Sequence, residues 1–229
     1  MWARLADEAP RFFTYYNGIF LLQAMGATLL LSLGGCLAGS FFGLLLVLLR
    51  KTKGALFLVP RALAWGFVEF FRRVPPLVVL LLAFFASNLV KMDVSLFLVA
   101  LVALTFVATA FMAEIIRAGI EGVHPNQWDS AATMNFGYLR TMLTIILPQA
   151  WKIILPPAFS FFLLFVKDTA FASQLGTLEL TYAGKVLTSR GFTAVLSYGS
   201  ILVLYFALSY PLARFGAWLE DRLAPSGNH

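Results

Sequence analysis

Long apolar stretches separated by short polar segments make up most of the chain. A transmembrane helix needs about 20 consecutive, mostly apolar residues, because the hydrocarbon core of a bilayer is about 30 Å thick. The pattern therefore predicts an all-α membrane protein, with about five transmembrane helices in a single transmembrane domain at residues 1–229. The predicted spans are residues 19–49, 56–87, 95–117, 149–167 and 194–219.

The composition supports this prediction and excludes several other classes of protein. Of the 229 residues, 60% are hydrophobic and 12% are charged, and the mean hydropathy is +0.84. Soluble domains carry about 45–50% apolar and about 25% charged residues, so a soluble enzyme and a disordered chain are excluded. A single cysteine, Cys36, and two histidines indicate neither an intrachain disulfide nor a metal cluster.

The distribution of Lys and Arg predicts how the spans are oriented. The net charge is +6 at pH 7, and short loops rich in Lys and Arg usually face the cytoplasm. The basic loop with Arg50, Lys51 and Lys53 is therefore assigned to the cytoplasm. Since five spans place the termini on opposite sides, we expect the N-terminus outside and the C-terminus inside. The positive charge is expected to meet membrane lipid and no nucleic acid, because the sequence has no long basic run.

The first predicted span carries a regular glycine pattern. Gly35, Gly39 and Gly43 recur at every fourth position and so share one helix face. Such a face lets the backbone of a neighbouring helix approach closely. The alternative is the general glycine richness of membrane helices, and we favour the packing face.

Residues 118–148 differ in character from the spans, because they are polar and lie between two of them. Pro125 can open a helix at its first turn, which places Asp129 near the positive end of that helix. Asn135 and Gly137 both tolerate left-handed backbone angles and are expected to end it. A second helix then runs toward Pro148. We interpret this helix–turn–helix on the membrane surface as a docking element for a cytoplasmic partner, the alternative being a plain connecting loop.

Ionisable residues inside the predicted spans are the other candidates for function. Glu69 and Arg72 lie three positions apart and can pair on one helix face. Lys167 and Asp168 follow a long apolar run. Charged groups at membrane depth are costly and face a cavity or one another, so these residues either contact a substrate or form structural ion pairs. A structural role is favoured for Glu114, near the cytoplasmic end of its span.

The polar segment resembles the cytoplasmic loop of binding-protein-dependent ABC importer permeases. That family's signature is Glu-Ala-Ala, a Gly four residues later, and then Ile-x-Leu-Pro. The positions here that align with it are Asp129, Ser130, Ala131, Asn135, Ile145, Leu147 and Pro148. Further motifs are similar to the polar amino-acid branch of the family, and they lie at residues 67–75, 113–120, 127–128, 147–150, 155–157 and 167–180. Together they extend from about residue 18 to the end of the fifth predicted span.

The chain departs from the family pattern at several of these positions. Asp129 replaces the usual Glu, Ser130 replaces the first Ala, and Asn135 replaces the Gly of the turn. Ala170 stands where the family often has Ser. The Asn substitution suits a left-handed turn, so docking is expected to be retained. The departures suit one half of a heterodimer whose partner holds more of the substrate contacts.

The resemblance implies a type I ABC importer permease of the bacterial cytoplasmic membrane. Such a chain works with an ABC ATPase dimer, a second permease subunit (here expected to be similar but distinct), an extracytoplasmic solute-binding protein and an amino-acid substrate. The ATPase binds ATP and Mg²⁺, and the permease itself holds no cofactor and catalyses no reaction. The implied ATPase-coupling residues are Gln127, Asp129, Ser130, Ala131, Ala132 and Asn135. The candidate substrate-path residues are Glu69, Arg72, Lys167, Asp168 and Thr169.

Two alternatives remain open at the level of the sequence. The chain could be an ABC permease for another small solute, such as an organic sulfonate or a metal chelate. It could also be an ATP-independent carrier or a scaffold subunit. The segment Lys167-Asp168-Thr169 argues for the amino-acid branch, and an odd number of spans does not divide into the inverted repeats typical of carriers.

Overall fold

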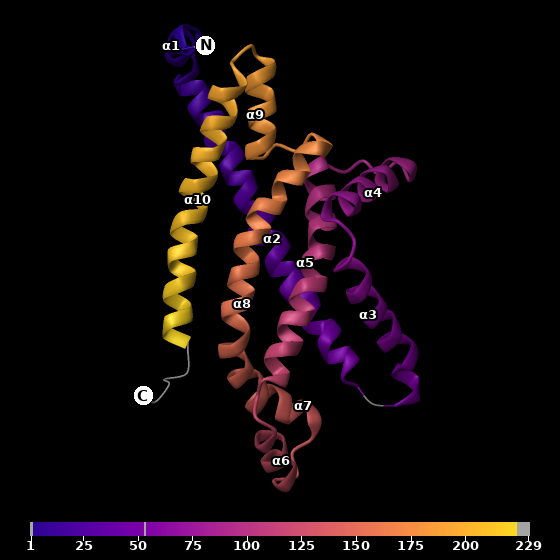
Figure 1. Cartoon of the computed structure of the whole chain (residues 1–229). Helices are drawn as coiled ribbons and strands as arrows, with labels where there is room; N and C mark the ends of the chain where they lie inside the picture. The colour runs from indigo at the N-terminus through magenta and orange to yellow at the C-terminus, as the bar shows by residue number, and fades with distance from the viewer. Residues whose placement is uncertain (1, 53, 224–229) are drawn as a thin grey trace.

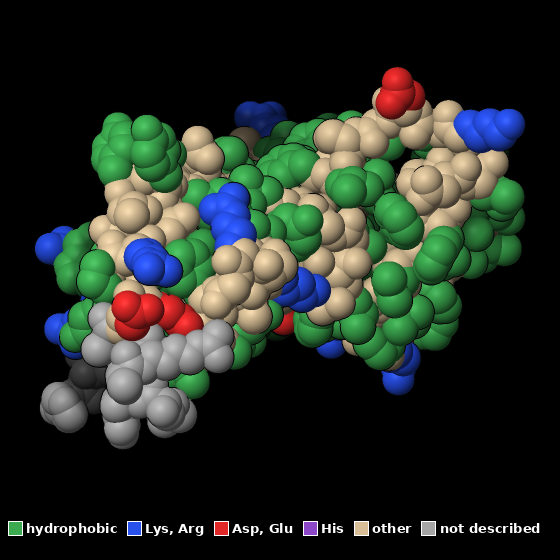
Figure 2. Space-filling model, turned by 90° about the horizontal axis from the view of Figure 1, so that it is seen from above, with side chains coloured by type: hydrophobic (Ala, Val, Ile, Leu, Met, Phe, Trp, Pro, Cys, Tyr) green, Lys and Arg blue, Asp and Glu red, His purple; other side chains and the backbone are tan. Residues whose placement is uncertain are grey.

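The computed structural model describes residues 2–52 and 54–223, and helices make up nearly all of them. Long helices run between the two ends of the molecule, with α1 at one end and α6 at the other (Figure 1). Seen from above, hydrophobic side chains are spread widely over the surface, and charged groups lie at scattered positions among them (Figure 2). No strand occurs within these described residues, which agrees with the predicted all-α class. Lys53 of the predicted basic loop and the C-terminus itself lie outside the described residues.

The element bounds follow the apolar pattern closely. In chain order they are α1 Trp2–Phe12, α2 Tyr15–Arg50, the 3-10 helix η1 Ala55–Phe57, α3 Leu58–Phe71, α4 Pro76–Leu89, α5 Leu96–Glu121, α6 Pro125–Thr133, α7 Tyr138–Thr141, the π-helical turn η2 Met142–Ile146, α8 Leu147–Asp168, the 3-10 helix η3 Thr169–Leu175, α9 Leu180–Ser189 and α10 Ala194–Leu223. Four helical segments are long and apolar enough to cross a membrane, and a bent pair brings the number to as many as five. The segments of the first, third and fifth predicted spans are α2, α5 and α10.

The span predicted at residues 56–87 is not one straight helix. It consists of α3 and α4, which meet at an angle of 113°. The consecutive Pro75 and Pro76 explain the bend, because neither has a backbone N–H to continue α3 and each restricts the residue before it. Pro76 instead opens α4 at its first turn.

The predicted loop at 118–148 is also shorter than expected. Helix α5 continues to Glu121, and a single helical run from Tyr138 to Leu175 includes α7, η2, α8 and η3. The π-helical turn ends at Ile146, two positions before Pro148, which lies in the first turn of α8. Since Pro148 has no N–H to donate, the wider turn accommodates it without ending the helix.

The glycine face of α2 packs as the sequence predicts. A Cβ atom on Gly39 would lie 2.6 Å from the Cβ of Ala108, and one on Gly43 would lie 2.9 Å from the backbone nitrogen of Ala113. Both neighbours belong to α5, the helix that α2 contacts most closely. Van der Waals packing and close backbone approach drive helix association in lipid. The α2–α5 crossing is therefore the central contact on which the other helices assemble.

Two apolar cores lie on either side of this crossing. One includes Leu31, Leu104 and Phe165 from α2, α5 and α8, and all three are fully buried. The other includes Ile116 of α5 and Ile146, which belongs to the π-helical turn beside α6. This second core fixes the helical run that carries the polar segment.

Candidate functional site

Helix α6 forms from the residues that the sequence singled out. The imidazole of His124 accepts a hydrogen bond from the N–H of Asn126 at 3.2 Å, and Pro125 occupies the first turn. Asn135 has a left-handed backbone with φ of +56°, which confirms the predicted end of the helix. Gly137 does not share that role, because its φ is −68° and it precedes α7 in an extended conformation. A left-handed glycine is therefore not needed there.

One face of α6 is tied to the rest of the chain. Gln149 of α8 donates a hydrogen bond to the side-chain oxygen of Gln127 at 3.1 Å. The ring of Trp128 stacks on that of Tyr138 with their centroids 6.2 Å apart. Ala131 is only 1% exposed. The expectation that Ala131 offers a surface to a partner is thus corrected: its small side chain lets α6 pack on its own chain.

The opposite face of α6 is open to solvent. Asp129, Ser130 and Ala132 are exposed, as is Asn135 just after the helix. Helix α6 projects beyond the ends of the long helices, so this face is not shielded by them (Figure 1). The arrangement presents one carboxylate, one hydroxyl and one small side chain on a rigid helix, which can form charge-assisted hydrogen bonds and close contacts with a second protein.

A cluster of charges links three helices near the same end of the molecule. Glu114 of α5 accepts hydrogen bonds from Arg50 at 2.9 Å and from Arg117 at 2.9 and 3.1 Å. Arg72, at the end of α3, lies 3.4 Å from the same carboxylate. We call Glu114 and these three arginines the Glu114 cluster. It joins α2, α3 and α5, which agrees with the structural role expected for Glu114.

The predicted pairing of Glu69 with Arg72 is wrong. Glu69 pairs with Arg73, four positions along α3, while Arg72 reaches across to Glu114. Both i,i+3 and i,i+4 spacings allow a pair on one helix, and the nearby acidic group on α5 decides between them. The sequence could not indicate this, because it depends on how α3 and α5 cross.

The other substrate-path candidates do not join these residues. Thr169 is fully buried, and its hydroxyl donates to the carbonyl of Val166 at 2.7 Å. Lys167 is exposed and Asp168 is partly buried. Within residues 2–52 and 54–223, no recorded hydrogen bond or ion pair connects Lys167 or Asp168 to Glu69. The five candidates therefore form two groups, one at the end of α3 with Glu69 and Arg72 and one at the end of α8 with Lys167, Asp168 and Thr169.

Glu179 is a buried acidic residue whose structural role the sequence did not reveal. Its carboxylate accepts hydrogen bonds from the N–H groups of Thr181 at 2.8 Å and Tyr182 at 2.6 Å, which caps α9. It also accepts one from the hydroxyl of Tyr205 on α10 at 3.0 Å. Ser, Thr, Asp and Asn are the usual helix N-caps, so a Glu gives no clear capping signal.

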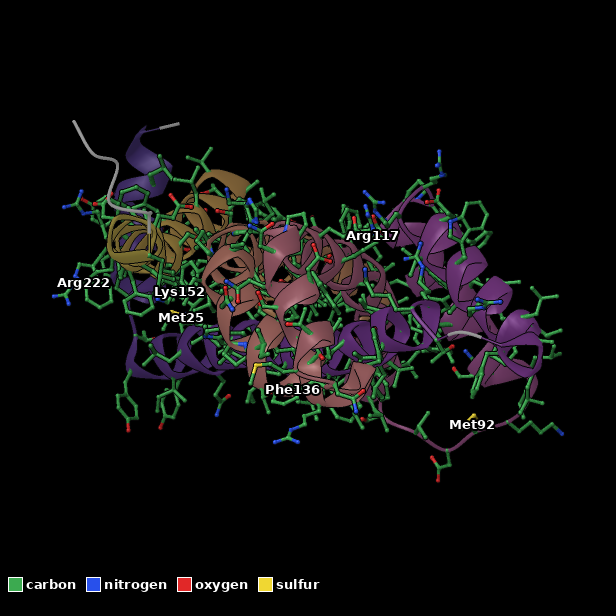
Figure 3. All side chains as sticks on the ribbon, turned by 90° about the horizontal axis from the view of Figure 1, so that it is seen from below. Met25, Met92, Arg117, Phe136, Lys152 and Arg222 are labelled. Carbon is green, nitrogen blue, oxygen red and sulfur yellow. The ribbon has the colours of Figure 1, made fainter. Side chains whose placement is uncertain are left out.

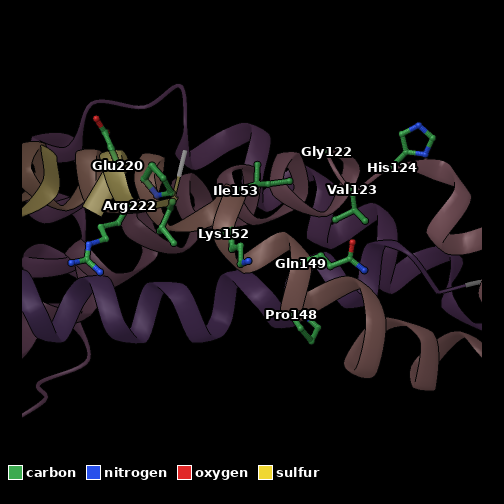
Figure 4. Close-up of a pocket in the computed structure, with 11 residues that line it drawn as sticks. Gly122, Val123, His124, Pro148, Gln149, Lys152, Ile153, Glu220 and Arg222 are labelled. Carbon is green, nitrogen blue, oxygen red and sulfur yellow. The ribbon is translucent and has the colours of Figure 1, made fainter. Parts of the chain in front are cut away.

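A cavity of about 950 Å³ with both polar and apolar lining residues lies beside the start of α6. Its lining comes from the segment between α5 and α6, the first turns of α8 and the end of α10. Figure 4 shows Gln149 and Lys152 on α8, Glu220 and Arg222 on α10, and His124 just before α6. From below, Arg222 lies at the end of the molecule opposite α3 (Figure 3). In the described part of the chain, no group of three or more His, Cys, Asp or Glu residues could hold a metal ion.

These features define a multi-pass membrane protein with a short polar helix held at one end. Residues 39–225 match the sequence model of the binding-protein-dependent transport system inner membrane component, and the chain belongs to this family. It is thus a permease subunit of an ABC transporter in the inner membrane, a component of a transport system. Family membership implies an ATPase and a solute-binding protein as partners.

Curated relatives and solved structures agree with this assignment. The probable amino-acid ABC transporter permease protein YckA of Bacillus subtilis is 32% identical over 90% of this chain and 89% of its own length. The probable glutamine ABC transporter permease protein GlnM of the same organism is 35% identical over 83% of this chain and 87% of its own length. A crystal structure of an amino acid ABC transporter with histidines is 27% identical, with a TM-score of 0.81 over 90% of this chain and 94% of that one. The inward-facing MetNI methionine ABC transporter shares the fold, with a TM-score of 0.78 at 19% identity over 93% of this chain and 100% of that one.

Proposed function

We propose that this chain is a transmembrane subunit of an ATP-driven importer that carries a polar amino acid across the cytoplasmic membrane. The proposal rests on the way in which α6 is held and exposed. It is fixed to its own chain through Gln127 and Trp128, and it presents Asp129 and Ser130 to the outside. A helix that is both rigidly attached and exposed can transmit a push from a partner to the helices behind it.

The coupling runs from α6 to the membrane helices through the helical run Tyr138–Leu175. Helix α6 packs against the π-helical turn η2, whose Ile146 is buried in the core shared with α5. When the ATPase subunits close on ATP and Mg²⁺, movement of α6 reaches α8 through this contact. Asp129 forms charge-assisted bonds to the ATPase, and Ala132 permits its close approach.

The substrate class rests on the relatives and on the sequence motifs. Relatives named as amino-acid and glutamine permeases align with most of the chain, and Lys167-Asp168-Thr169 matches the amino-acid branch. Lys167 can meet a carboxylate and Asp168 an ammonium group, whereas Arg72 and Glu69 already pair with Glu114 and Arg73. A second, similar but distinct permease subunit supplies further substrate contacts, which suits the departures of this chain from the family pattern, such as Ala170.

The proposed orientation places α6 in the cytoplasm. The C-terminal end of α2, with Arg50 and Lys51, lies toward the same end of the molecule as α6 (Figure 1). Basic residues in short loops favour the cytoplasmic side. The start of α2 then lies outside, where the solute-binding protein delivers the amino acid.

The coupling role is tested with a charge reversal at Asp129. The transporter is purified from native membranes through a tag on this chain, identified by its co-purifying subunits, and reconstituted in liposomes with the binding protein. Asp129→Lys should lower ATP-dependent uptake about tenfold or more, because a charge-assisted hydrogen bond contributes about 1.5–3 kcal/mol. Asp93→Lys is the matched control, since Asp93 is an exposed acidic residue in the loop between α4 and α5. Equal uptake by the two variants would show that α6 does not couple the ATPase to transport.

The substrate class is tested separately with the same liposomes. Uptake of radiolabelled polar amino acids is compared with that of an organic sulfonate and a metal chelate. Saturable amino-acid uptake that requires ATP supports the proposal. Uptake of a sulfonate or chelate alone supports the ABC permease for another solute, and uptake without ATP supports a carrier.

A further inference from the structure

A small basic pocket lies where α2 ends and α3 begins, away from α6. It has a volume of about 300 Å³ and is lined by Arg50, Leu58, Arg61, Ala62 and Trp65. Two guanidinium groups and three apolar side chains therefore face one space. We propose that this pocket binds the phosphate of an anionic phospholipid, whose acyl chains lie along the exposed face of α3.

The charge balance around the pocket favours an anion. Arg50 connects the pocket to the Glu114 cluster and, through Arg117, to the pair formed by Glu121 and Lys51. Among the described residues, this region contains five cationic side chains and two acidic ones, a surplus of three positive charges. The cationic residues are Arg50, Lys51, Arg61, Arg72 and Arg117, and the acidic ones are Glu114 and Glu121. The side chain of Arg50 is only 14% exposed, and its acidic partner Glu114 is shared with Arg72 and Arg117. A further anion would therefore lower the cost of the surplus positive charge.

The guanidinium groups also retain donors for such an anion. Each arginine carries five N–H donors in a planar fork that matches the geometry of phosphate. In the described residues, Arg61 donates one recorded hydrogen bond, to the carbonyl of Thr52 at 3.0 Å. Arg50 donates one, to Glu114. Most of the donors of Arg61 are thus available to a ligand in the pocket.

The apolar lining decides between a phospholipid and a free phosphate ion. Leu58 is 62% exposed and Trp65 is 57% exposed, and Leu63 between them is equally open. Trp residues are enriched at the boundary between the hydrocarbon core and the headgroups. If the membrane-spanning helix α2 ends at that boundary with Arg50, Trp65 lies at the boundary as well. Acyl chains cover such apolar side chains, whereas inorganic phosphate leaves them exposed. The inference requires only that α2 spans the membrane, and it does not depend on the proposed transport.

Native mass spectrometry of the full chain, released from detergent micelles with added lipids, tests the proposal. The probes are phosphatidylglycerol and phosphatidylcholine of matched acyl chains. Wild-type protein should retain one phosphatidylglycerol in preference to phosphatidylcholine. Arg61→Gln should weaken this retention about fivefold. A basic residue near an anionic lipid contributes about 1 kcal/mol, which corresponds to a factor of about five in affinity. Arg61→Lys should retain most of the preference, and Trp65→Ala should weaken the binding of both lipids.

Arg214→Gln is the matched control, because Arg214 is exposed on α10 and lies outside the pocket. Every variant is first checked for monodisperse elution and an unchanged unfolding temperature, and Arg61→Lys covers the case in which Arg61→Gln does not fold. Equal retention of the two lipids by the wild type overturns the proposal. So does an equal loss in Arg61→Gln and Arg214→Gln. Displacement of the bound lipid by inorganic phosphate at equal concentration shows a general anion site and overturns the assignment to a phospholipid.

Discussion

Glu114 and Arg50 are joined by a hydrogen bond of 2.9 Å, although 64 positions separate them in the sequence. Their side chains are 15% and 14% exposed. The contact fixes the end of α2 against α5 beyond the glycine crossing. Arg72 and Arg117 pair with Glu114 as well. The bend between α3 and α4 is therefore anchored to the same carboxylate.

Replacing Glu114 should destabilise the chain strongly. Glu114→Ala leaves three neighbouring arginines without their shared acidic partner, and removing one member of a buried ion pair costs about 3–5 kcal/mol. With partial exposure, we expect the lower end of that range. Thermal unfolding in detergent, followed by tryptophan fluorescence, measures the effect. Glu121→Ala is the control: its side chain is 47% exposed, so we expect a loss of about 1 kcal/mol or less. Similar losses in the two variants would show that Glu114 has no anchoring role.

The α2–α5 crossing predicts that alanine substitutions at two glycines of α2 have opposite effects on stability. Gly39→Ala places a Cβ atom 2.6 Å from Ala108 and 2.9 Å from the backbone nitrogen of Thr109, and overpacking of this kind costs about 1–3 kcal/mol. Gly26→Ala meets nothing within 4 Å, so the higher helix propensity of Ala should leave stability unchanged or raise it by up to about 1 kcal/mol. Unfolding temperatures of the purified variants give the comparison. A drop for Gly26→Ala as large as that for Gly39→Ala would contradict the crossing.

Local signals in the sequence were enough to predict most of the fold. A bilayer requires long apolar helices, so α5 at Leu96–Glu121 lies close to the predicted span at 95–117. Pro125 and Asn135 define α6, because Pro125 fixes its own φ at the start and Asn135 tolerates the left-handed backbone that ends the helix. The glycine repeat of α2 predicted a close approach, since only a neighbouring backbone makes use of a face without side chains.

Contacts between distant elements could not be read from the same signals. The partner of Arg72 depends on where α3 passes α5, and the burial of Ala131 depends on how α6 rests on η2. The bend between α3 and α4 has a visible cause in Pro75 and Pro76, but its angle is set by tertiary packing. The partners of the candidate substrate residues could not be predicted for the same reason, because those contacts depend on how helices far apart in the sequence pack together.

The left-handed backbone of Asn135 makes a specific prediction about the end of α6. Asn135→Val should destabilise this turn by about 1–2 kcal/mol, because a left-handed backbone is unfavourable for a residue with a branched Cβ. Asn135→Gly should be tolerated, since glycine adopts φ of +56° without strain. Hydrogen exchange of the α6 amides in purified protein measures the local stability. Gly137→Ala is the control, because its φ is −68° and a Cβ there meets nothing within 4 Å. Faster exchange in the Gly137 variant than in Asn135→Val would contradict this account of the turn.

Replacing Glu179 should lower the stability of the chain by more than any one of its hydrogen bonds contributes. Its carboxylate satisfies two N–H groups at the start of α9 and the hydroxyl of Tyr205 on α10. Glu179→Ala leaves all three donors without this partner in a fully buried position, and hydrogen bonds to a charged group contribute about 1.5–3 kcal/mol each. Tyr205→Phe removes one donor and leaves the helix cap intact, so it should cost about half as much or less. Glu220→Ala, an exposed carboxylate on α10, should cost least. Thermal unfolding of the three variants in detergent ranks them, and a Glu179 variant as stable as the Glu220 variant would show that α9 needs no acidic cap.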